Sequence, residues 1–257
     1  MKREVICLAC LVLTILIVGC KNEKEYGVGL RGPSGGYIFY DCDADNESGN
    51  PDGLISTECG WRFLEAAPAD LRLVDGIPTV DSSKEGYSEA TAKYVFGIYI
   101  VADDGAFVNG TQVYNAADCT RTGIGEGKHN TRQLYYCMAE KASYVYDERT
   151  TGNYAARLCE LLTHKSKGVL YDDWFLPSKE ELNQIFLNLY QHGLGMLEGM
   201  YWSSSELDIE YYSNNPPEWS RVWIQYFYDG RNWYDDGDQL IEIRSEEYKI
   251  RPVRAFI

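Results

Sequence analysis

Basic residues are scarce in this chain relative to acidic ones. Its 257 residues include 24 Lys and Arg against 39 Asp and Glu, which gives a formal net charge of −15. A chain this acidic repels phosphate backbones and anionic lipid headgroups. The sequence shows no local basic patch that would offset this repulsion. We therefore expect no nucleic acid partner, and polysulfated glycans are disfavoured as ligands.

Several catalytic patterns are missing as well. The chain has three His residues, and none lies beside a nucleophile motif such as GxSxG. The segment GIGEGK at residues 123–128 looks like a phosphate-binding loop. However, Thr122 stands where that motif needs a glycine, and His129 replaces the Ser or Thr that holds magnesium. Acidic pairs are plentiful, so residue types alone leave a glycosidase open, although no spacing favours one. We expect a protein without enzymatic activity.

The composition is that of a folded chain. Hydrophobic residues make up 45% of it and aromatic residues 14%, enough for a core. The 21 Tyr and 6 Trp suit wet recognition surfaces as well as cores. The length fits one or two domains. Because no long linker, repeat or low-complexity segment follows Gly35, we expect one domain over residues 35–257.

The N-terminus carries an export signal. Lys2 and Arg3 precede an apolar run over residues 5–18, which is shorter than the ~20 residues that a membrane-spanning helix needs. The run ends in Gly19-Cys20, which resembles the lipobox of bacterial lipoproteins. That resemblance implies a signal peptide over residues 1–19 and a lipid on Cys20 that anchors the chain in the cell envelope, in the periplasm or at the surface. The alternative is an uncleaved signal anchor. Residues 20–34 are polar and rich in glycine, so we expect a flexible tether there.

Export changes the interpretation of the cysteines. Five remain after Cys20, an odd number, so at least one stays free or pairs outside the chain. Cys42 and Cys59 bracket a loop rich in Gly, Asp, Asn and Pro, and we expect them to form a disulfide worth roughly 3 kcal/mol. The alternative is two separate buried thiols. No CxxC motif occurs, so nothing supports zinc or thioredoxin-like chemistry. The remaining cysteines, whose pairing stays open, are Cys119, Cys137 and Cys159.

The local patterns predict an α+β fold. The best local signal is a helix that Ser178 caps, with Glu181 completing a capping box and an apolar stripe of Leu182, Ile185, Phe186 and Leu189. Two further helices are expected over residues 132–142, which Asn130 and Thr131 would cap, and 154–163. Strands are expected at residues 37–40, 61–65, 93–100, 200–205, 221–228, 231–234 and 249–256. Helices in the middle followed by a meander of strands are typical of α+β rather than alternating βαβ folds.

Six motifs resemble one family. They are GGYIFYD at residues 35–41, GWRFLEAAP at 60–68, TGIG at 122–125 followed by Asn130-Thr131, DWFLPSKEEL at 173–182, YWSSSE at 201–206, and RPVRAF at 251–256. Together they resemble exported bacterial proteins typified by the C-terminal domain of the collagen-like adhesin Lcl. The resemblance implies a C-type lectin-like fold, related to the formylglycine-generating-enzyme branch, and a role in attachment. No cysteine follows Cys159, so the late cysteine pair of that enzyme branch is absent. The sequence has no collagen-like Gly-X-Y stem before the domain, so we do not expect the domain to be presented as a trimer on a stalk.

The lectin-like resemblance implies a ligand surface on the late strands and loops. Flat aromatic rings offer stacking area at low entropy cost, and an arginine adds a planar guanidinium group with several hydrogen-bond donors. The alternation within residues 221–228 does not show which face of the strand is exposed to solvent. Half of the candidate side chains could instead belong to the core. We expect a glycan or a protein as the ligand; the alternatives are a structural envelope lipoprotein without a ligand and an unrecognised hydrolase. The candidate residues are Tyr211, Tyr212, Trp219, Tyr226, Tyr228, Arg231, Trp233 and Tyr234.

A candidate calcium loop follows the first expected strand. Asp41, Asp43 and Asp45 alternate, and Asp52 lies eleven residues after Asp41, which is the oxygen spacing of a calcium loop. Asn46 stands where such a loop prefers glycine. The alternative is a solvated acidic loop. A weaker second cluster consists of Asp235, Asp236 and Asp238.

Overall fold

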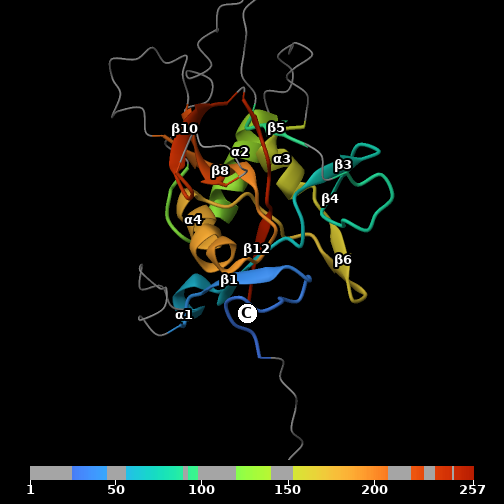
Figure 1. The fold of residues 1–257 in the computed structure, drawn as a ribbon, viewed down its shortest axis with the longest axis vertical. Helices are drawn as coiled ribbons and strands as arrows, with labels where there is room; N and C mark the ends of the chain where they lie inside the picture. Colours follow the sequence, from blue (N-terminus) through green and yellow to red (C-terminus); the bar gives the residue numbers. More distant parts are fainter. Residues whose placement is uncertain are drawn as a thin grey trace, which may run out of the picture.

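The computed structural model describes residues 25–44, 56–88, 92–97, 120–139, 153–207, 221–228, 235–244 and 246–257. In these residues the chain has an α+β architecture, with several small antiparallel sheets around a few helices (Figure 1). In the described part of the chain, no helix is long and apolar enough to cross a membrane. The elements are β1 (Tyr37–Asp41), α1 (Ser56–Cys59), β2 (Phe63–Ala66), β3 (Arg72–Val74), β4 (Ile77–Thr79), β5 (Tyr94–Val95), α2 (Gly127–Ala139), α3 (Ala155–Glu160), β6 (His164–Ser166), β7 (Val169–Tyr171), α4 (Lys179–Asn188), the 3-10 helix η3 (Tyr190–His192), β8 (Gly199–Glu206), β9 (Arg221–Phe227), β10 (Gln239–Ile243), β11 (Glu247–Tyr248) and β12 (Val253–Phe256).

One sheet joins the two ends of the domain. Its strand order is β1-β2-β12, all antiparallel, so Ala66 in the middle strand lies opposite Tyr37 on one side and Val253 on the other. Val253 also exchanges backbone hydrogen bonds of 2.8 and 2.9 Å with Phe175. The C-terminal strand is therefore fixed on both sides, which explains why all four residues of β2 are buried.

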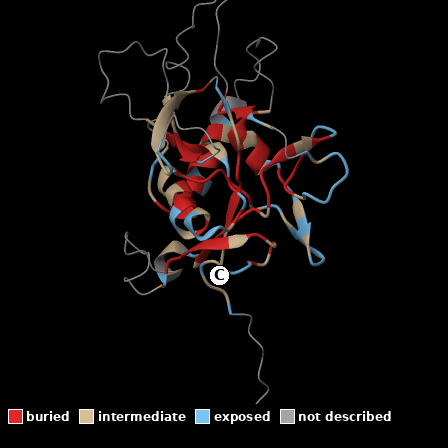
Figure 2. Cartoon of the chain, viewed as in Figure 1, coloured by how far each residue is buried: buried red, intermediate tan, exposed pale blue. Residues whose placement is uncertain are grey.

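The second sheet has the order β10-β9-β8. Its central strand, β9, is buried on both faces in its second half, because Ile224 contributes to one hydrophobic cluster and Phe227 to another. The first cluster gathers around Trp174 and Trp202, and the second around Phe39 and Tyr201. Figure 2 shows these core elements as the red interior of the molecule.

The capped helix forms as predicted. In α4, the Ser178 hydroxyl accepts a hydrogen bond from the Glu181 N–H, and the Glu181 carboxylate accepts one from the Ser178 N–H, so the capping box is complete. The predicted stripe is buried, with Leu182, Ile185, Phe186 and Leu189 between 0% and 7% exposed.

The other two helices differ from the prediction in their bounds. Helix α2 begins at Gly127, so the expected caps Asn130 and Thr131 lie inside it. Their side chains make tertiary contacts instead: the Asn130 amide donates to the Arg121 carbonyl at 2.7 Å, and the Thr131 hydroxyl accepts from the Leu176 N–H at 2.9 Å. Helix α3 ends at Glu160, because the chain turns there into β6.

The chain packs against the domain earlier than expected. Within the predicted tether, Gly29 donates to the Ile38 carbonyl at 2.8 Å, and the Tyr26 ring packs on those of Phe63 and Phe256. Ser34 is completely buried. Residues 26–34 therefore belong to the folded unit in this structure.

Two short hairpins project from the domain, and the sequence analysis did not predict them. Strands β3 and β4 turn at Asp75-Gly76, and β6 and β7 turn at Lys167-Gly168; each turn pair has positive φ angles. Such pairs match the twist of short hairpins. Figure 2 shows the β6–β7 hairpin mainly in pale blue, which marks exposure, whereas in the β3–β4 hairpin only the turn at residues 75–77 is exposed.

Candidate functional site

The structure removes one residue from the predicted ligand surface. Tyr226 is 2% exposed, because β9 is the central strand of its sheet and other segments cover both faces. The prediction that Tyr226 contacts a ligand is therefore wrong. Tyr228 is 46% exposed, as a ligand contact must be. The remaining candidates lie outside the described residues, and their roles stay predictions: Tyr211, Tyr212, Trp219, Arg231, Trp233 and Tyr234.

An arginine from outside the candidate calcium loop pairs with two of its aspartates. The Arg62 guanidinium donates to both oxygens of Asp41, at 2.9 and 3.0 Å, and lies 3.7 Å from Asp43. Asp43 also accepts from the Ser56 hydroxyl at 2.6 Å, and hydrogen bonds from Ser56 hold its pKa below the usual value. A calcium ion at Asp41 and Asp43 would have to displace Arg62. Asp45 and Asp52 lie outside the described residues, so calcium binding stays a prediction.

The second acidic cluster forms a turn. The Asp235 N–H donates to the Asp238 carboxylate at 3.0 Å, and the Tyr228 N–H donates to Asp236 at 3.1 Å. Among the described residues, no group of three or more His, Cys, Asp or Glu side chains is arranged to hold a metal ion. The contacts of this cluster are therefore those of a turn.

Cys42 and Cys59 lie close enough in space for the charge of Cys59 to act on Cys42. Cys42 is buried, and its thiol donates to the Trp61 carbonyl at 3.2 Å. Burial, followed by the charges of Asp43, Cys59 and Asp41, raises the pKa of Cys42 to about 11. The disulfide between them stays a prediction. Cys159 is completely buried, as expected of a cysteine that packs as a small apolar side chain.

The carboxyl group of Glu181 has a raised pKa, yet its contacts are structural. Burial raises its pKa to about 7, against the lowering effect of hydrogen bonds from the Ser178, Gly125 and Gly127 N–H groups. Perturbed carboxyl groups often mark active sites. Here both oxygens accept from backbone donors, at distances from 2.7 to 3.4 Å. Glu181 therefore ties α4 to the start of α2.

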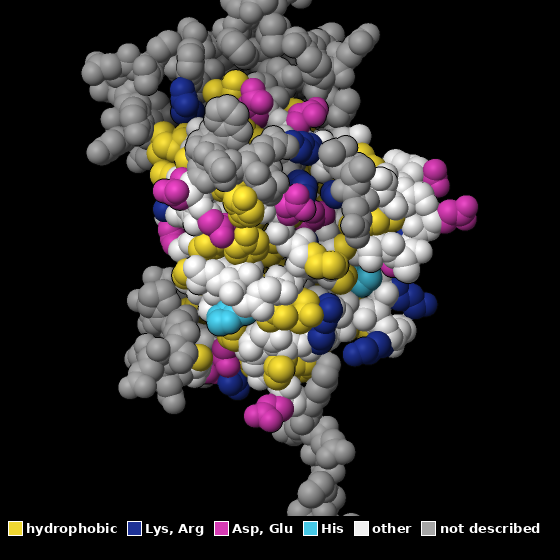
Figure 3. All heavy atoms as spheres, viewed as in Figure 1, with side chains coloured by type: hydrophobic (Ala, Val, Ile, Leu, Met, Phe, Trp, Pro, Cys, Tyr) yellow, Lys and Arg dark blue, Asp and Glu magenta, His cyan; other side chains and the backbone are white. Residues whose placement is uncertain are grey.

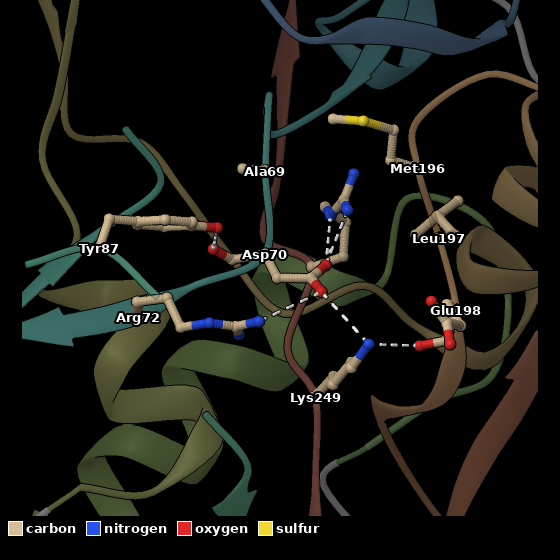
Figure 4. A pocket seen from close by; sticks show the side chains of 9 residues that line it. Ala69, Asp70, Arg72, Tyr87, Met196, Leu197, Glu198 and Lys249 are labelled. Atoms are coloured by element: carbon tan, nitrogen blue, oxygen red, sulfur yellow. Dashed lines mark hydrogen bonds and ion pairs between the residues drawn. The ribbon is translucent and has the colours of Figure 1, made fainter. Parts of the chain in front are cut away.

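A cavity of about 240 Å³ lies beside Asp70, the residue that follows the AAPA segment after β2. The loop before β8 provides one wall, the start of β3 another, and the segment before β12 a third. Figure 4 shows Arg72 and Lys249 converging on the Asp70 carboxylate, with Tyr87 and Met196 at opposite sides of the opening. The lining residues are Ala69, Asp70, Arg72, Tyr87, Met196, Leu197, Glu198, Lys249 and Arg251.

Buried donors fix the Asp70 carboxylate. The Arg251 Nε and Nη2 atoms donate to Oδ1 at 2.9 and 2.7 Å, and the Tyr201 hydroxyl donates to Oδ2 at 3.0 Å. Burial acts to lower the pKa of Arg251, but the charge of Asp70 outweighs it and the pKa is raised, so Arg251 stays charged. Burial and the charge of Asp70 raise the pKa of Tyr201, which keeps this hydroxyl a donor. Asp70 is therefore an anchor for cations rather than a base.

Two further cations approach Asp70 less closely. Arg72 Nη2 lies 3.8 Å and Lys249 Nζ 3.9 Å from Oδ2, both beyond hydrogen-bond length. The Arg72 Nε donates to the Ser88 carbonyl at 2.8 Å, and Lys249 Nζ donates to the Glu198 carbonyl at 2.6 Å. Three cations thus surround one carboxylate, and the exposed Glu198 is the other acidic residue of the lining. The cavity has an excess of positive charge in a chain whose net charge is −15.

Sequence reasoning missed this cluster because its members are far apart in the chain. Asp70 and Arg251 are separated by 181 positions, and the sequence around each of them does not reveal its partner. A weak signal existed: Asp70 and Arg251 are charged residues within apolar stretches, and such residues are usually paired when buried. No basic patch is visible along the sequence, but in the structure Arg72, Lys249 and Arg251 meet around Asp70.

The cavity can bind an anionic group. Cationic side chains lie near Asp70 in this cavity. Tyr87, Leu197 and Met196 add apolar surface to its lining. Met196 is 78% exposed with a φ of +48°, an uncommon backbone conformation for a residue with a side chain.

In comparisons with known proteins, no family model, no curated protein and no solved structure matches the chain.

Proposed function

We propose that this protein is a lipid-anchored, non-catalytic binding protein of the bacterial cell envelope, and that its ligand is a glycan with a carboxylate group that enters the Asp70 cavity. The observation that carries this proposal is the cluster of Arg72, Lys249 and Arg251 around a single buried carboxylate. In an acidic protein, a local positive potential favours an anionic group over a neutral one.

The envelope location and the lectin-like fold rest on the sequence. The Gly19-Cys20 exit of the apolar run supports lipidation, and the six family motifs support a C-type lectin-like domain. The α+β architecture with short antiparallel sheets is consistent with that fold. The non-catalytic role is supported by Asp70, whose two oxygens both accept short hydrogen bonds from buried donors.

The anchor has a direct test. Cys20→Ala should abolish metabolic lipid labelling and release the protein from the membrane fraction, because the apolar run over residues 5–18 is too short to hold the chain by itself. A variant that stays in the membrane without label would instead support an uncleaved anchor.

The binding test compares two oligosaccharides that differ in the carboxylate on each sugar unit. Oligogalacturonate and the corresponding neutral galactose oligomer are titrated calorimetrically into the detergent-solubilised, lipidated protein. We expect binding of the acidic oligomer, weakened by salt, and about tenfold weaker binding in Lys249→Gln, since one charge-assisted hydrogen bond is worth roughly 1.5–3 kcal/mol.

The matched control for this test is Lys128→Gln. Lys128 is exposed on α2 and does not line the cavity, so this variant loses the same charge elsewhere on the surface. Equal binding of the two sugars, or equal losses in both variants, would contradict the proposed site. Failure of both sugars to bind would favour a structural envelope lipoprotein.

A further inference from the structure

We infer that the hairpin formed by β6 and β7 is a second membrane contact, which rests on the anionic surface of the bilayer that holds the lipid anchor. This inference rests on the lipid anchor of the proposed function and is independent of the Asp70 cavity. It concerns residues 164–171, whose sequence HKSKGVLY combines cationic and aliphatic side chains.

The end of this hairpin is both basic and apolar. Lys165 and Lys167 are exposed, and the aliphatic side chains of Val169 and Leu170 are 52% and 59% exposed. Lys165 lies opposite Leu170 in the antiparallel register, so a cation and an aliphatic chain share one face of the hairpin. Exposed aliphatic side chains bordered by lysines are typical of surfaces that enter the headgroup region of a membrane.

The turn residue adds a second observation. Lys167 has a φ of +50° and is followed by Gly168 with a φ of +86°. Asn, Asp and Gly adopt this left-handed conformation more readily than Lys, so a lysine is not the residue that the turn geometry favours. A cation at the extreme tip of the hairpin is therefore explained better by what the tip contacts than by the turn itself.

The acidic neighbours of the hairpin lie toward its base. Asp173 is paired with Arg254 at 2.8 Å, and Asp172 directly follows β7. The charge of His164 helps, after hydrogen bonds from Ser83, to lower the pKa of Asp81, which places Asp81 near the start of β6. The two lysines project beyond these groups, so the tip carries positive charge. Figure 3 shows Lys and Arg side chains at the lower right of the molecule, the side on which Figure 1 places β6.

The base of the hairpin is attached to the segment that leads to the anchor. The Tyr171 hydroxyl donates to the Pro33 carbonyl at 3.1 Å, and a ring nitrogen of His164 lies 3.2 Å from the Ser34 carbonyl. Figure 1 shows the hairpin directed toward the end of the molecule where β1 and the C-terminus lie. The packed chain begins by Tyr26, six residues after Cys20, and six residues span at most about 20 Å. A lipid on Cys20 would thus keep this end of the domain close to the bilayer.

The net negative charge of the domain favours the orientation in which the β6–β7 hairpin faces the bilayer. An acidic domain is repelled by anionic lipids, and the repulsion is weakest when a basic feature faces them. Two lysines alone would bind a membrane weakly. With the lipid already inserted, however, the contact is intramolecular, and a weak interaction suffices to orient the domain.

The test uses the lipidated full chain, reconstituted into vesicles of phosphatidylcholine with or without phosphatidylglycerol. Flotation first establishes that the protein is anchored, and amide hydrogen exchange then follows the peptide that covers residues 164–171. We expect at least about threefold slower exchange at Val169 and Leu170 in the vesicles that contain phosphatidylglycerol, and loss of this difference at high salt.

Two double variants make the test specific. K165Q/K167N removes the charge while placing at position 167 a residue that suits its positive φ, so the turn is kept. K93Q/K128Q removes the same charge from two exposed sites outside the hairpin, one before β5 and one on α2. The first variant should lose the slowing and the second should keep it, with thermal midpoints near that of the unmodified protein.

Each other outcome overturns the inference. Equal exchange in the two kinds of vesicle would leave the hairpin available for a protein or glycan partner instead, and equal losses in both double variants would reduce the effect to net charge. A chain that does not float would refute the lipid anchor and, with it, this contact. If the chain floats but exchange does not slow, the anchor stands and the hairpin contact alone fails.

Discussion

Single buried carboxylates hold distant segments of this protein together. Glu65 accepts from the Ser34 and Gly36 N–H groups and pairs with Arg254, while Asp70 pairs with Arg251. Glu181 differs, because its donors are neutral backbone groups rather than a cation. This difference explains why burial raises the pKa of Glu181 to about 7.

The raised pKa of Glu181 predicts a pH dependence of stability. Between its usual pKa of 4.5 and about 7, the folded chain keeps a proton that the unfolded chain has released. The free energy of unfolding should therefore fall as the pH rises through this window, by up to about 3 kcal/mol, and level off above it. Urea unfolding at a series of pH values measures this change.

Glu181→Gln provides the reference, because glutamine keeps the shape and does not titrate. The difference between the unmodified protein and this variant isolates Glu181 from the other carboxyl groups. The variant should lose the fall in stability between pH 4.5 and 7. The same slope in both proteins would show that Glu181 is ionised throughout.

At the scale of elements, the start of α4 is the best-defined local structure. The Ser178 hydroxyl accepts from the Glu181 N–H at 3.2 Å and donates to the Gly123 carbonyl at 2.7 Å. One side chain thus caps the helix and connects it to the segment before α2.

Ser178→Ala should lower the free energy of unfolding by about 1–2 kcal/mol, because it removes a helix cap and leaves the partly buried Gly123 carbonyl without this donor. Ser178→Thr, which retains the hydroxyl, should lose less. Ser82→Ala, at an exposed position, serves as the control. Chemical denaturation measures the free energy of unfolding of the three variants. Equal values for Ser178→Ala and Ser82→Ala would refute the structural role of the cap.

At the scale of the whole molecule, the last strand closes the fold. Strand β12 supplies a neighbour for β2, the Val253 pairing with Phe175, and the Arg254 ion pairs with Asp173 and Glu65. Deleting residues 253–257 should prevent stable folding, since it exposes β2 and leaves Glu65 buried without its cation, and broken buried pairs typically cost 3–5 kcal/mol.

Deleting Ile257 alone is the matched control, because this residue is 86% exposed. It should leave the thermal midpoint and the circular dichroism spectrum unchanged. A cooperative thermal transition in the chain that lacks residues 253–257 would show that the rest of the domain folds without β12.

Features that depend on near neighbours in the chain could be predicted from the sequence. The α4 capping box needs residues three positions apart, and the buried stripe of that helix follows from a 3.6-residue period. The strands around residues 37–40, 200–205 and 221–228, and with them the α+β class, follow from β-branched and aromatic runs.

Contacts between distant side chains, and the burial that follows from them, became known from the three-dimensional structure. Alternation along β9 could not reveal that Tyr226 is buried, because a central strand between two covering layers has no wet face there. The cations of the Asp70 cavity are Arg72, Lys249 and Arg251. Lys249 is held by its bridge to Tyr201 of β8, and Arg251 directly precedes β12, which pairs with the distant β2. Charge attraction and burial act through space, so a pattern along the chain cannot express these contacts.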